Sequence, residues 1–460
     1  MSKKSIFFTL SIFITILLVA FTYYKRLSLY PYNTSLSYKY DFNNTDATSI
    51  SLKLKNSMLD LSKVDLTNKT VFLEVTVSTK SLGKVFQPSI KTSLNSKSIE
   101  TFFEPLANGK RYINITSLCQ DDIKKVKLTP KWLEIDPLVK LIYFKKPKIK
   151  NKTILVISPH PDDAEIAAYG FYSNSNKNTY IITITAGDAG LNNYDEIYKD
   201  PKKSYFEKAK LRVINSWCVP FIGGIPVKNS LNLGYFDATL KEIYQKQPLS
   251  VKSKQTLLNT TTIYRSFNTS PLIKELTTTK NSWNSLVEDL RYLLKKIKPD
   301  IVVTPYPAID AHPDHQYSTI AVFEAIKELK LTNIELFLYT NHFNLCEIYP
   351  FGKMYSNLTL PPVVKDGLYF KSIYSYSLPF YKQQEKILAL EAMNDIRLDT
   401  EWKSVSGSFM VFLKNFVKNI ILDDDERYFR RSVKTDELFF IIDSKKLYDK
   451  KVYKKLTEPF

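Results

Sequence analysis

The sequence predicts an α/β protein: a Rossmann-like domain with a mostly parallel sheet, preceded by a small all-β domain and by an N-terminal transmembrane helix. Three patterns predict this. The chain opens on an uncharged apolar run, then alternates polar and apolar residues up to about residue 150. From residue 152 it combines continuous apolar runs with helical patterns. Its 460 residues suffice for these parts.

The first 26 residues predict a membrane anchor. The run from Ser5 to Tyr24, "SIFFTLSIFITILLVAFTYY", carries no charge, and about twenty such residues are what a helix needs to cross a bilayer. Tyrosines at its end suit the membrane interface, and no small-x-small cleavage site follows. We expect residues 1–26 to be a single-pass anchor. The membrane is then a partner and the rest of the chain is exported to a periplasmic or extracytoplasmic location. Basic residues flank both ends, so the orientation stays open.

Residues 27–150 predict a β-rich, sandwich-like domain. Stretches such as "TVFLEVTVST" and "RYINITSL" alternate with period two and are separated by Asn, Ser, Gly and Pro. The segment contains no histidine. We therefore expect it to act as a spacer or to bind a glycan or a partner.

Residues 151–400 predict the α/β domain. "TILVIS" and "TYIITITAG" are apolar, β-branched runs typical of strands buried on both faces of a parallel sheet. Residues 283–297 place leucines at helical spacing, and the strand "IVVTPY" follows at once. Residues 241–280 are a polar insertion that could serve as a lid. Residues 401–460 are expected to be a C-terminal extension that packs on this domain.

The formal net charge of +19 favours contact with something anionic, such as headgroups, an acidic glycan or nucleic acid. No cysteine finger and no aromatic RNA-binding motif is present, so we expect no nucleic-acid partner. A solvated lysine-rich surface accounts for most of this charge.

The histidines carry the chemical signal. The chain has four, and three of them fall in two short motifs, "PHPDD" at His160 and "AHPDH" at His312 and His315. Each motif follows a predicted parallel strand. In an open α/β sheet, that edge is where ligands bind.

The spacing of these residues suits one metal ion. His160 and Asp163 are three apart across a strand-to-helix turn, and His312 and His315 are three apart at a helix start. Two imidazoles, one carboxylate and water make a catalytic zinc site with an open position. Alone, the first motif could be a helix cap and the second a surface pair. Their joint occurrence favours the metal site. His342 is expected to be a structural histidine at a strand end.

These residues resemble a family. "PHPDDAE", followed far downstream by "HPDH", is similar to the PIG-L/LmbE-like zinc de-N-acetylases, which remove acetyl from N-acetylglucosaminyl groups. The resemblance covers roughly residues 152–400 and includes "TAGDAG", "KAKLRVINS" and "LGYFDATL". It implies a zinc-dependent hydrolase, with another divalent metal such as Fe²⁺ as a second choice. Its partner would be an N-acetylated amino sugar in an envelope glycan or glycolipid.

The resemblance also implies residue roles, position by position. The metal ligands would be His160, Asp163 and His315. The catalytic groups would be Asp162 as general base, His312 as the electrophile that stabilises the oxyanion, and Asp314 as the carboxylate that orients and charges His312. Arg212 would contact the substrate.

The sequence departs from the family pattern at three positions. Ala164 and Asn215 stand where a glutamate is common, and Asp310 stands where some members have a tyrosine. Two alternatives remain open. One is a metal-dependent phosphoesterase, which usually needs more carboxylates for two metals. The other is a non-catalytic glycan-binding relic of the enzyme.

Overall fold

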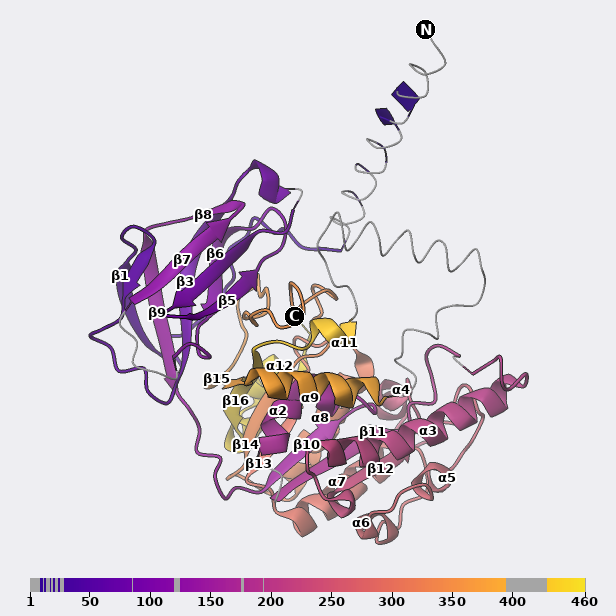
Figure 1. Ribbon diagram of the computed structural model, residues 1–460. Coiled ribbons are helices and arrows are strands. Elements are labelled where there is room, and N and C mark those ends of the chain that lie inside the picture. Colours follow the sequence, from indigo (N-terminus) through magenta and orange to yellow (C-terminus); the bar gives the residue numbers. More distant parts are fainter. Residues whose placement is uncertain are drawn as a thin grey trace.

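The computed structural model describes residues 9–10, 12–13, 17, 20, 24, 29–84, 86–119, 125–174, 178–192, 194–393 and 428–459. Within them the chain forms three β-sheets. Two lie in a β-rich unit formed by the first third of the chain, and the third is covered by helices on both faces (Figure 1).

The β-rich unit is a pair of antiparallel sheets around one core. The first sheet has the order β1-β9-β3-β6, with β8 on β3, and the second has the order β2-β7-β4-β5. Alternating apolar residues of both sheets, such as Val75 on β3 and Leu128 on β7, share one buried cluster. The strands are β1 (Thr48–Lys53), β2 (Met58–Asp60), β3 (Lys69–Thr79), β4 (Ser89–Leu94), β5 (Lys97–Phe102), β6 (Asn108–Asn114), β7 (Lys125–Lys131), β8 (Leu133–Ile135) and β9 (Leu138–Lys145).

The third sheet has seven strands in the order β12-β11-β10-β13-β14-β16-β15. The first five are mutually parallel, and β16 is antiparallel to both of its neighbours. Their apolar runs are buried along nearly the whole length because helices cover both faces. The strands are β10 (Ile154–Ser158), β11 (Thr179–Thr185), β12 (Ser230–Tyr235), β13 (Ile301–Pro305), β14 (Glu335–Tyr339), β15 (Ser372–Ser377) and β16 (Asp436–Asp443).

Alternate residues of β10 face different helix layers. Leu155 and Ile157 share a buried cluster with residues of α7, α8 and α12, whereas Ile154 and Val156 share one with α2 and α9. The helices are α2 (Asp163–Asn174), α3 (Pro201–Ile222), α4 (Leu240–Gln245), α5 (Thr262–Arg265), α6 (Pro271–Lys274), α7 (Trp283–Ile297), α8 (Pro313–Glu328), α9 (Phe380–Glu391), α11 (Tyr428–Arg431) and α12 (Lys450–Thr457).

The predicted fold class needs correction. The described chain is a mixed α/β molecule in which antiparallel pairing prevails: nine of its strand pairings are antiparallel and four are parallel. Only five strands follow the parallel pattern predicted for the α/β domain. The sequence argument missed the other two because apolar runs do not reveal strand direction.

The predicted transmembrane helix also needs correction. None of the helices in the described ranges combines the length and the apolar character that crossing a bilayer requires. The single-pass anchor at residues 1–26, the membrane partner and the exported location that followed from it are therefore not supported. Most of the run from Ser5 to Tyr24 lies outside the described residues.

The C-terminal segment does more than pack on the α/β unit. Its strand β16 is inserted between β14 and β15, and it pairs with β14 from Glu335↔Asp443 to Leu338↔Phe440. The apolar run "ELFFII" explains this position, because a strand inside the sheet is covered on both faces. Residues 401–427 of the predicted extension lie outside the described residues.

The β-rich unit and the seven-stranded sheet share a buried aromatic cluster. Phe42 packs 6.1 Å from Phe144 of β9 and 5.9 Å from Phe370, between ring centroids. Asn114 of β6 donates from Nδ2 to Ser375 Oγ of β15 at 2.8 Å. These contacts fix the β-rich unit against the sheet.

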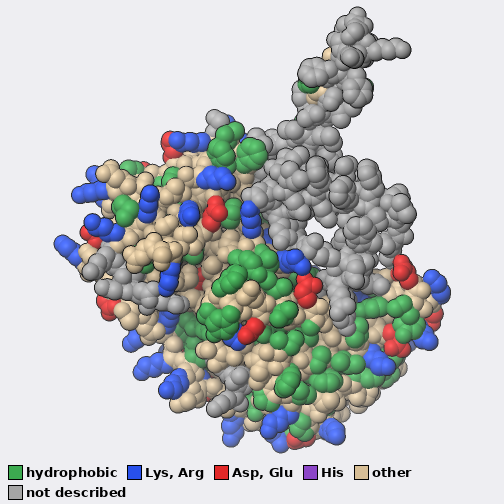
Figure 2. All heavy atoms as spheres, viewed as in Figure 1, with side chains coloured by type: hydrophobic (Ala, Val, Ile, Leu, Met, Phe, Trp, Pro, Cys, Tyr) green, Lys and Arg blue, Asp and Glu red, His purple; other side chains and the backbone are tan. Residues whose placement is uncertain are grey.

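Positive charge is spread over one face of the molecule. On the face drawn in Figure 2, Lys and Arg side chains are scattered among polar and acidic groups and do not gather in one patch. This distribution fits a solvated lysine-rich surface.

Candidate metal centre and active site

The two histidine motifs lie beside each other at one edge of the seven-stranded sheet. β10 ends at Ser158 and β13 ends at Pro305, and the two strands are parallel neighbours. The loops that follow them therefore leave the sheet at the same edge. His160 lies in the first loop, and His312 and His315 lie at the start of α8.

Three side-chain atoms of these segments form a nearly equilateral triangle. Asp163 Oδ2 lies 3.1 Å from His160 Nδ1 and 3.1 Å from His315 Nε2, and the two ring nitrogens are 3.2 Å apart. A tetrahedral zinc ion bound at about 2.0–2.1 Å holds its ligand atoms about 3.3 Å apart. The spacing and the donor types therefore fit a divalent metal.

A carboxylate faces the second nitrogen of each imidazole. His160 Nε2 lies 3.2 Å from Asp237 Oδ1 and 3.4 Å from Asp314 Oδ2. His315 Nδ1 lies 3.1 Å from Asp310 Oδ2. Metal-binding histidines usually have such a partner, which fixes the ring and its tautomer. These carboxylate partners are a second feature that fits a metal site.

Asp163 is held from both sides. Asn341, just after β14, donates from Nδ2 to Asp163 Oδ1 at 2.8 Å. The backbone N–H of His160 donates to Oδ2, also at 2.8 Å. Asp163 is the first residue of α2. Its carboxylate therefore has a fixed orientation at the start of a helix.

The adjacent Asp162 has a different partner. Arg212 of α3 donates from Nη2 to Asp162 Oδ2 at 3.2 Å and to the carbonyl of Pro161 at 3.1 Å. Asp162 has a φ of 144°, a conformation that residues other than glycine rarely adopt. Strain of this kind costs about 1–3 kcal/mol and clusters at functional sites. Arg212, predicted to contact substrate, thus contacts the motif itself.

His312 lies over the triangle as a neutral imidazole. Its ring centroid is 4.6 Å from that of His160 and 5.0 Å from that of His315. Burial and these two rings lower the pKa of His312 to about 3. Its Nδ1 accepts the backbone N–H of Asp314 at 3.2 Å, which leaves Nε2 to carry the proton.

Asp314 is placed differently from the prediction. Its carboxylate accepts from the backbone N–H groups of Ala238, at 2.6 Å, and Leu240, at 3.1 Å, and it faces His160. The Asp314 side chain therefore orients His160, whereas its backbone orients His312. The predicted charging of His312 does not fit the lowered pKa of that ring.

The centre favours positive charge. Burial would lower the pKa of His315, but Asp163 and Asp310 raise it to about 10. Burial would also lower the pKa of His160, but Asp237 and the hydrogen bond that Asp163 accepts from the ring raise it well above its ordinary value. Burial would raise the pKa of Asp163, but His315 takes it well below its ordinary value. The carboxylates that raise the pKa of these two imidazoles would also attract a metal cation bound at the centre.

Three further residues lie at this site although the sequence did not predict them there. Asp237 follows β12, and Asn341 and His342 follow β14, so each comes after a parallel strand. The His342 ring lies 5.1 Å from that of His315, although it was predicted to be structural. Both "LGYFDATL" and "TNHF" lie at strand ends, but a lone Asp or Asn there is also a common turn residue, so this signal alone did not single them out.

A buried carboxyl follows the motif on α2. Glu165 accepts from Tyr172 Oη at 2.9 Å, and burial raises the pKa of Glu165 to about 8. Ala164, the departure from the family pattern, is buried, and its N–H donates to Ser158 Oγ at 3.1 Å. The small side chain therefore occupies a packed position.

The polar insertion is tied to the site. Ser253 Oγ donates to Asp188 Oδ2 at 2.6 Å, and the other oxygen of Asp188 accepts the N–H of Asp237 at 2.8 Å. Burial raises the pKa of Asp188 to about 7. This chain of contacts links residues 241–280 to the partner of His160.

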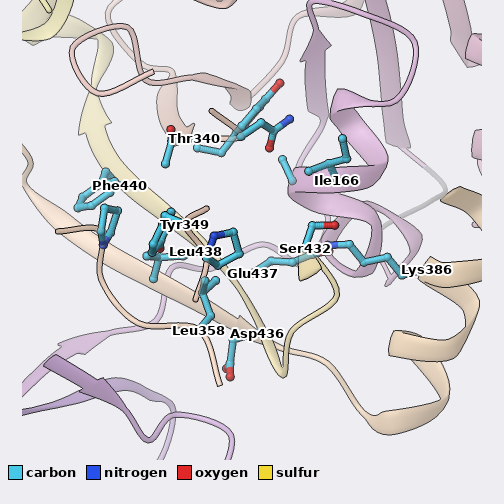
Figure 3. Close-up of a pocket in the computed structure, with 15 residues that line it drawn as sticks. Ile166, Thr340, Tyr349, Leu358, Lys386, Ser432, Asp436, Glu437, Leu438 and Phe440 are labelled. Carbon is cyan, nitrogen blue, oxygen red and sulfur yellow. The ribbon is translucent and has the colours of Figure 1, made fainter. Parts of the chain in front are cut away.

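A small cavity lies behind Asn341, between α2, β16 and α9. Figure 3 shows Ile166, Thr340, Tyr349, Lys386 and Glu437 among the residues around it. Its volume of about 50 Å³ is far below that of typical ligand pockets. None of the four histidines lines it. It is therefore separate from the triangle.

No curated protein matches this chain. Among solved structures, this chain is similar to the A40926 pseudoaglycone deacetylase Dbv21, which is 17% identical over 64% of this chain and 98% of that chain, with a TM-score of 0.35. The zinc-inhibited form of the teicoplanin deacetylase Orf2 is 17% identical over 63% and 98%, with a TM-score of 0.34.

A third solved structure has another activity. The 4-carboxy-2-hydroxymuconate hydratase GalB from Pseudomonas putida is 11% identical over 64% of this chain and 95% of that chain, with a TM-score of 0.32. Likenesses of this size carry no argument about activity.

A family model gives the assignment. The PIG-L model, described as GlcNAc-PI de-N-acetylase, matches residues 155–326. This segment is less than half of the chain, and it holds both histidine motifs. Residues 155–326 therefore form a domain of the PIG-L de-N-acetylase family.

Proposed function

We propose that this protein is a metal-dependent hydrolase that removes the acetyl group from an N-acetylated amino sugar in a glycan or glycolipid. The observation that carries the proposal is the triangle of His160, Asp163 and His315 beside the ion-paired Asp162. The family of residues 155–326 supports the same reaction. We further propose residues 151–400 as the catalytic domain and residues 27–150 as a β-rich accessory domain.

His160, Asp163 and His315 would hold the metal. When bound, a zinc ion or another divalent metal polarises a carbonyl and makes water more acidic. Asp237, Asp314 and Asp310 would keep the two imidazoles in the orientation and tautomer that binding needs.

Asp162 would act as the general base. Its carboxylate accepts a proton from the attacking water while Arg212 holds it in place. The water oxygen forms a bond to the acetyl carbon, and the C–N bond then breaks. The proton passes to the departing nitrogen, so the products are acetate and a free amino sugar.

His312 would stabilise the developing oxyanion. Because its Nδ1 accepts the N–H of Asp314, the N–H at Nε2 is available to donate to the acetyl oxygen. A neutral imidazole can fill this role, since the one N–H that it carries, at Nε2, donates a hydrogen bond. Its low pKa, about 3, agrees with this assignment.

The test is acetate release from an N-acetylglucosaminyl lipid and from an N-acetylglucosamine oligomer, with product masses read by mass spectrometry. We expect turnover by the parent and a loss of about 10²–10⁴-fold in Asp162→Asn. Asp366→Asn is the matched control, because Asp366 is exposed and pairs only at the surface with Lys39. No acetate from either substrate would contradict the proposal.

Metal content separates this proposal from the phosphoesterase alternative. Three groups of described residues could hold a cation, and each includes His160 or His315. The proposed triangle uses both His160 and His315 for one ion, since their facing ring nitrogens are 3.2 Å apart, so we expect one metal ion per chain. Two tightly bound ions, together with hydrolysis of a phosphate ester, would favour the alternative.

A further inference from the structure

Trp132 occupies an unusual position in the β-rich unit. It is the single residue between β7 and β8, and the chain crosses there from one sheet to the other. Its φ is 63°, in the left-handed region. Glycine adopts this conformation at no steric cost, whereas for a bulky residue it is a genuine outlier. A tryptophan therefore destabilises the backbone conformation between β7 and β8, so its presence there is not explained by the turn.

The surroundings hold the tryptophan in place. Lys80 donates its backbone N–H to the Trp132 carbonyl at 2.9 Å. Gly83 lies so close to the same carbonyl that a Cβ there would clash with it. Phe86, three residues after Gly83, stacks with Trp132, with ring centroids 6.0 Å apart and ring planes at 30° to each other. Two segments distant in sequence thus form one aromatic pair.

Polar groups surround this pair. Trp132 lines an open cavity of about 650 Å³, within the size range of ligand pockets. Lys80 and Glu134, which also line it, form an exposed ion pair at 2.8 Å, and the Lys131 ammonium lies 5.9 Å from the Trp132 ring. Trp132 is half-buried and Phe86 is exposed. We name these five residues the Trp132 hollow.

We propose that the Trp132 hollow binds a saccharide segment of the same glycan that the active site acts on. The aromatic face can cover the apolar C–H face of a sugar ring, since Trp and Tyr are amphipathic contact residues. The ammonium groups and the carboxylate supply donors and acceptors for hydroxyls and acetamido groups. The inference thus rests on the proposed function for its ligand class.

The location suits an accessory role. Figure 1 places β8 at the end of the β-rich unit, away from the helices that cover the seven-stranded sheet. The aromatic cluster around Phe42 fixes this unit against that sheet. A glycan held there stays bound to the same molecule as the catalytic edge, and a glycan chain long enough to reach that edge is presented to it at a raised effective concentration.

The test is calorimetric binding of an N-acetylglucosamine tetramer to the full-length protein. An Asp162→Asn background prevents turnover during the titration. We expect Trp132→Ala to lose one binding site per chain, or to weaken that site by about tenfold, the loss typical of an aromatic anchor. Leu138→Ala is the matched control, because Leu138 is exposed on the neighbouring β9 and does not line the hollow.

Trp132→Gly separates binding from stability. Glycine relieves the left-handed backbone, so this variant should unfold at a temperature no lower than Trp132→Ala and still lose the site. Unchanged tetramer binding in both variants would overturn the proposal, and so would a parent that binds no tetramer. If the parent releases acetate and tetramer binding is unchanged in the variants, the deacetylase proposal holds and the binding role of the Trp132 hollow is wrong. If binding depends on Trp132 but no acetate is released, the hollow binds a saccharide and the deacetylase proposal is wrong.

Discussion

Arg212 and Asp162 form an ion pair that depends on a glycine. Arg212 Nη2 lies 3.2 Å from Asp162 Oδ2, and both side chains are nearly buried. Gly187, after β11, lies directly against the Arg212 side chain, so that a Cβ there would come within 2.7 Å of Nε. The backbone of one loop thus limits where the guanidinium, and through it the proposed base, can lie.

Gly187→Ala should therefore damage catalysis through Arg212. The new methyl group would force the guanidinium away from Asp162, and the φ of 70° at this position adds backbone strain of about 1–3 kcal/mol. We expect a loss in kcat/KM of about tenfold or more, measured by acetate release, and a lower melting temperature.

Gly190→Ala supplies the matched control. Gly190 also has a positive φ, 78°, but a Cβ there would meet only Lys208 Nζ at 3.7 Å, an ordinary contact. Both variants carry the backbone strain, whereas only Gly187→Ala displaces Arg212 and should lose activity beyond that strain. Equal activity losses in both would show that strain, and not the position of Arg212, limits the enzyme.

Asp310→Asn should weaken metal binding without removing a ligand. Asp310 Oδ2 lies 3.1 Å from His315 Nδ1, and an amide there would hold the ring less firmly. Removal of such partners typically costs about 10–100-fold in metal affinity. Competition with a chelator would measure the change in affinity, and Asp366→Asn is the surface control. An unchanged affinity would assign Asp310 a purely structural role.

The sequence predicted that the two histidine motifs lie side by side, but not which other residues surround them. His160 and His312 each follow an apolar run, and strand ends share an edge in a parallel sheet, so their meeting could be predicted. Asp237 and Asn341 reach the same edge from two other strand ends, but a lone Asp or Asn in a loop is a common turn residue. Their roles follow only from contacts with His160 and Asp163.

The same limit applies to the fold. The run "ELFFII" could be read as a strand, but its place between β14 and β15 depends on a pairing that local pattern does not encode. The direction of Asp314 is a similar case, because its carboxylate turns to backbone N–H groups near Ala238 that lie far away in sequence. The place of β16 and the direction of the Asp314 carboxylate are both determined by residues that are distant in the sequence.

Metal removal should lower both activity and stability. Without a cation, His160, His315 and Asp163 keep only one another and the surrounding carboxylates. A ligand that binds only the folded state at 100 times its dissociation constant stabilises it by about 2.7 kcal/mol. We expect dialysis against a chelator to abolish acetate release and lower the melting temperature, and added zinc to restore both. His315→Ala should show no zinc-dependent shift, and a persisting shift would place the metal elsewhere.

Glu437 and Lys386 offer a test of how the C-terminal strand supports the site. Glu437 of β16 accepts the N–H groups of Gly170 and Phe171 at 2.9 and 2.8 Å, where α2 is interrupted at Ala168, and Lys386 Nζ donates to it at 2.9 Å. Both side chains of the ion pair are almost fully buried.

Glu437→Gln leaves the Lys386 ammonium buried without its carboxylate, and breaking a buried pair in this way costs about 3–5 kcal/mol. Denaturant unfolding should show this loss. Lys386→Met combined with Glu437→Gln should recover part of it, because no buried charge then remains unpaired.

The exposed Lys39–Asp366 pair is the control, since an Asp366→Asn change at the surface should cost less than about 1 kcal/mol. If the double variant were as unstable as the sum of the two single variants, the pair would not be coupled.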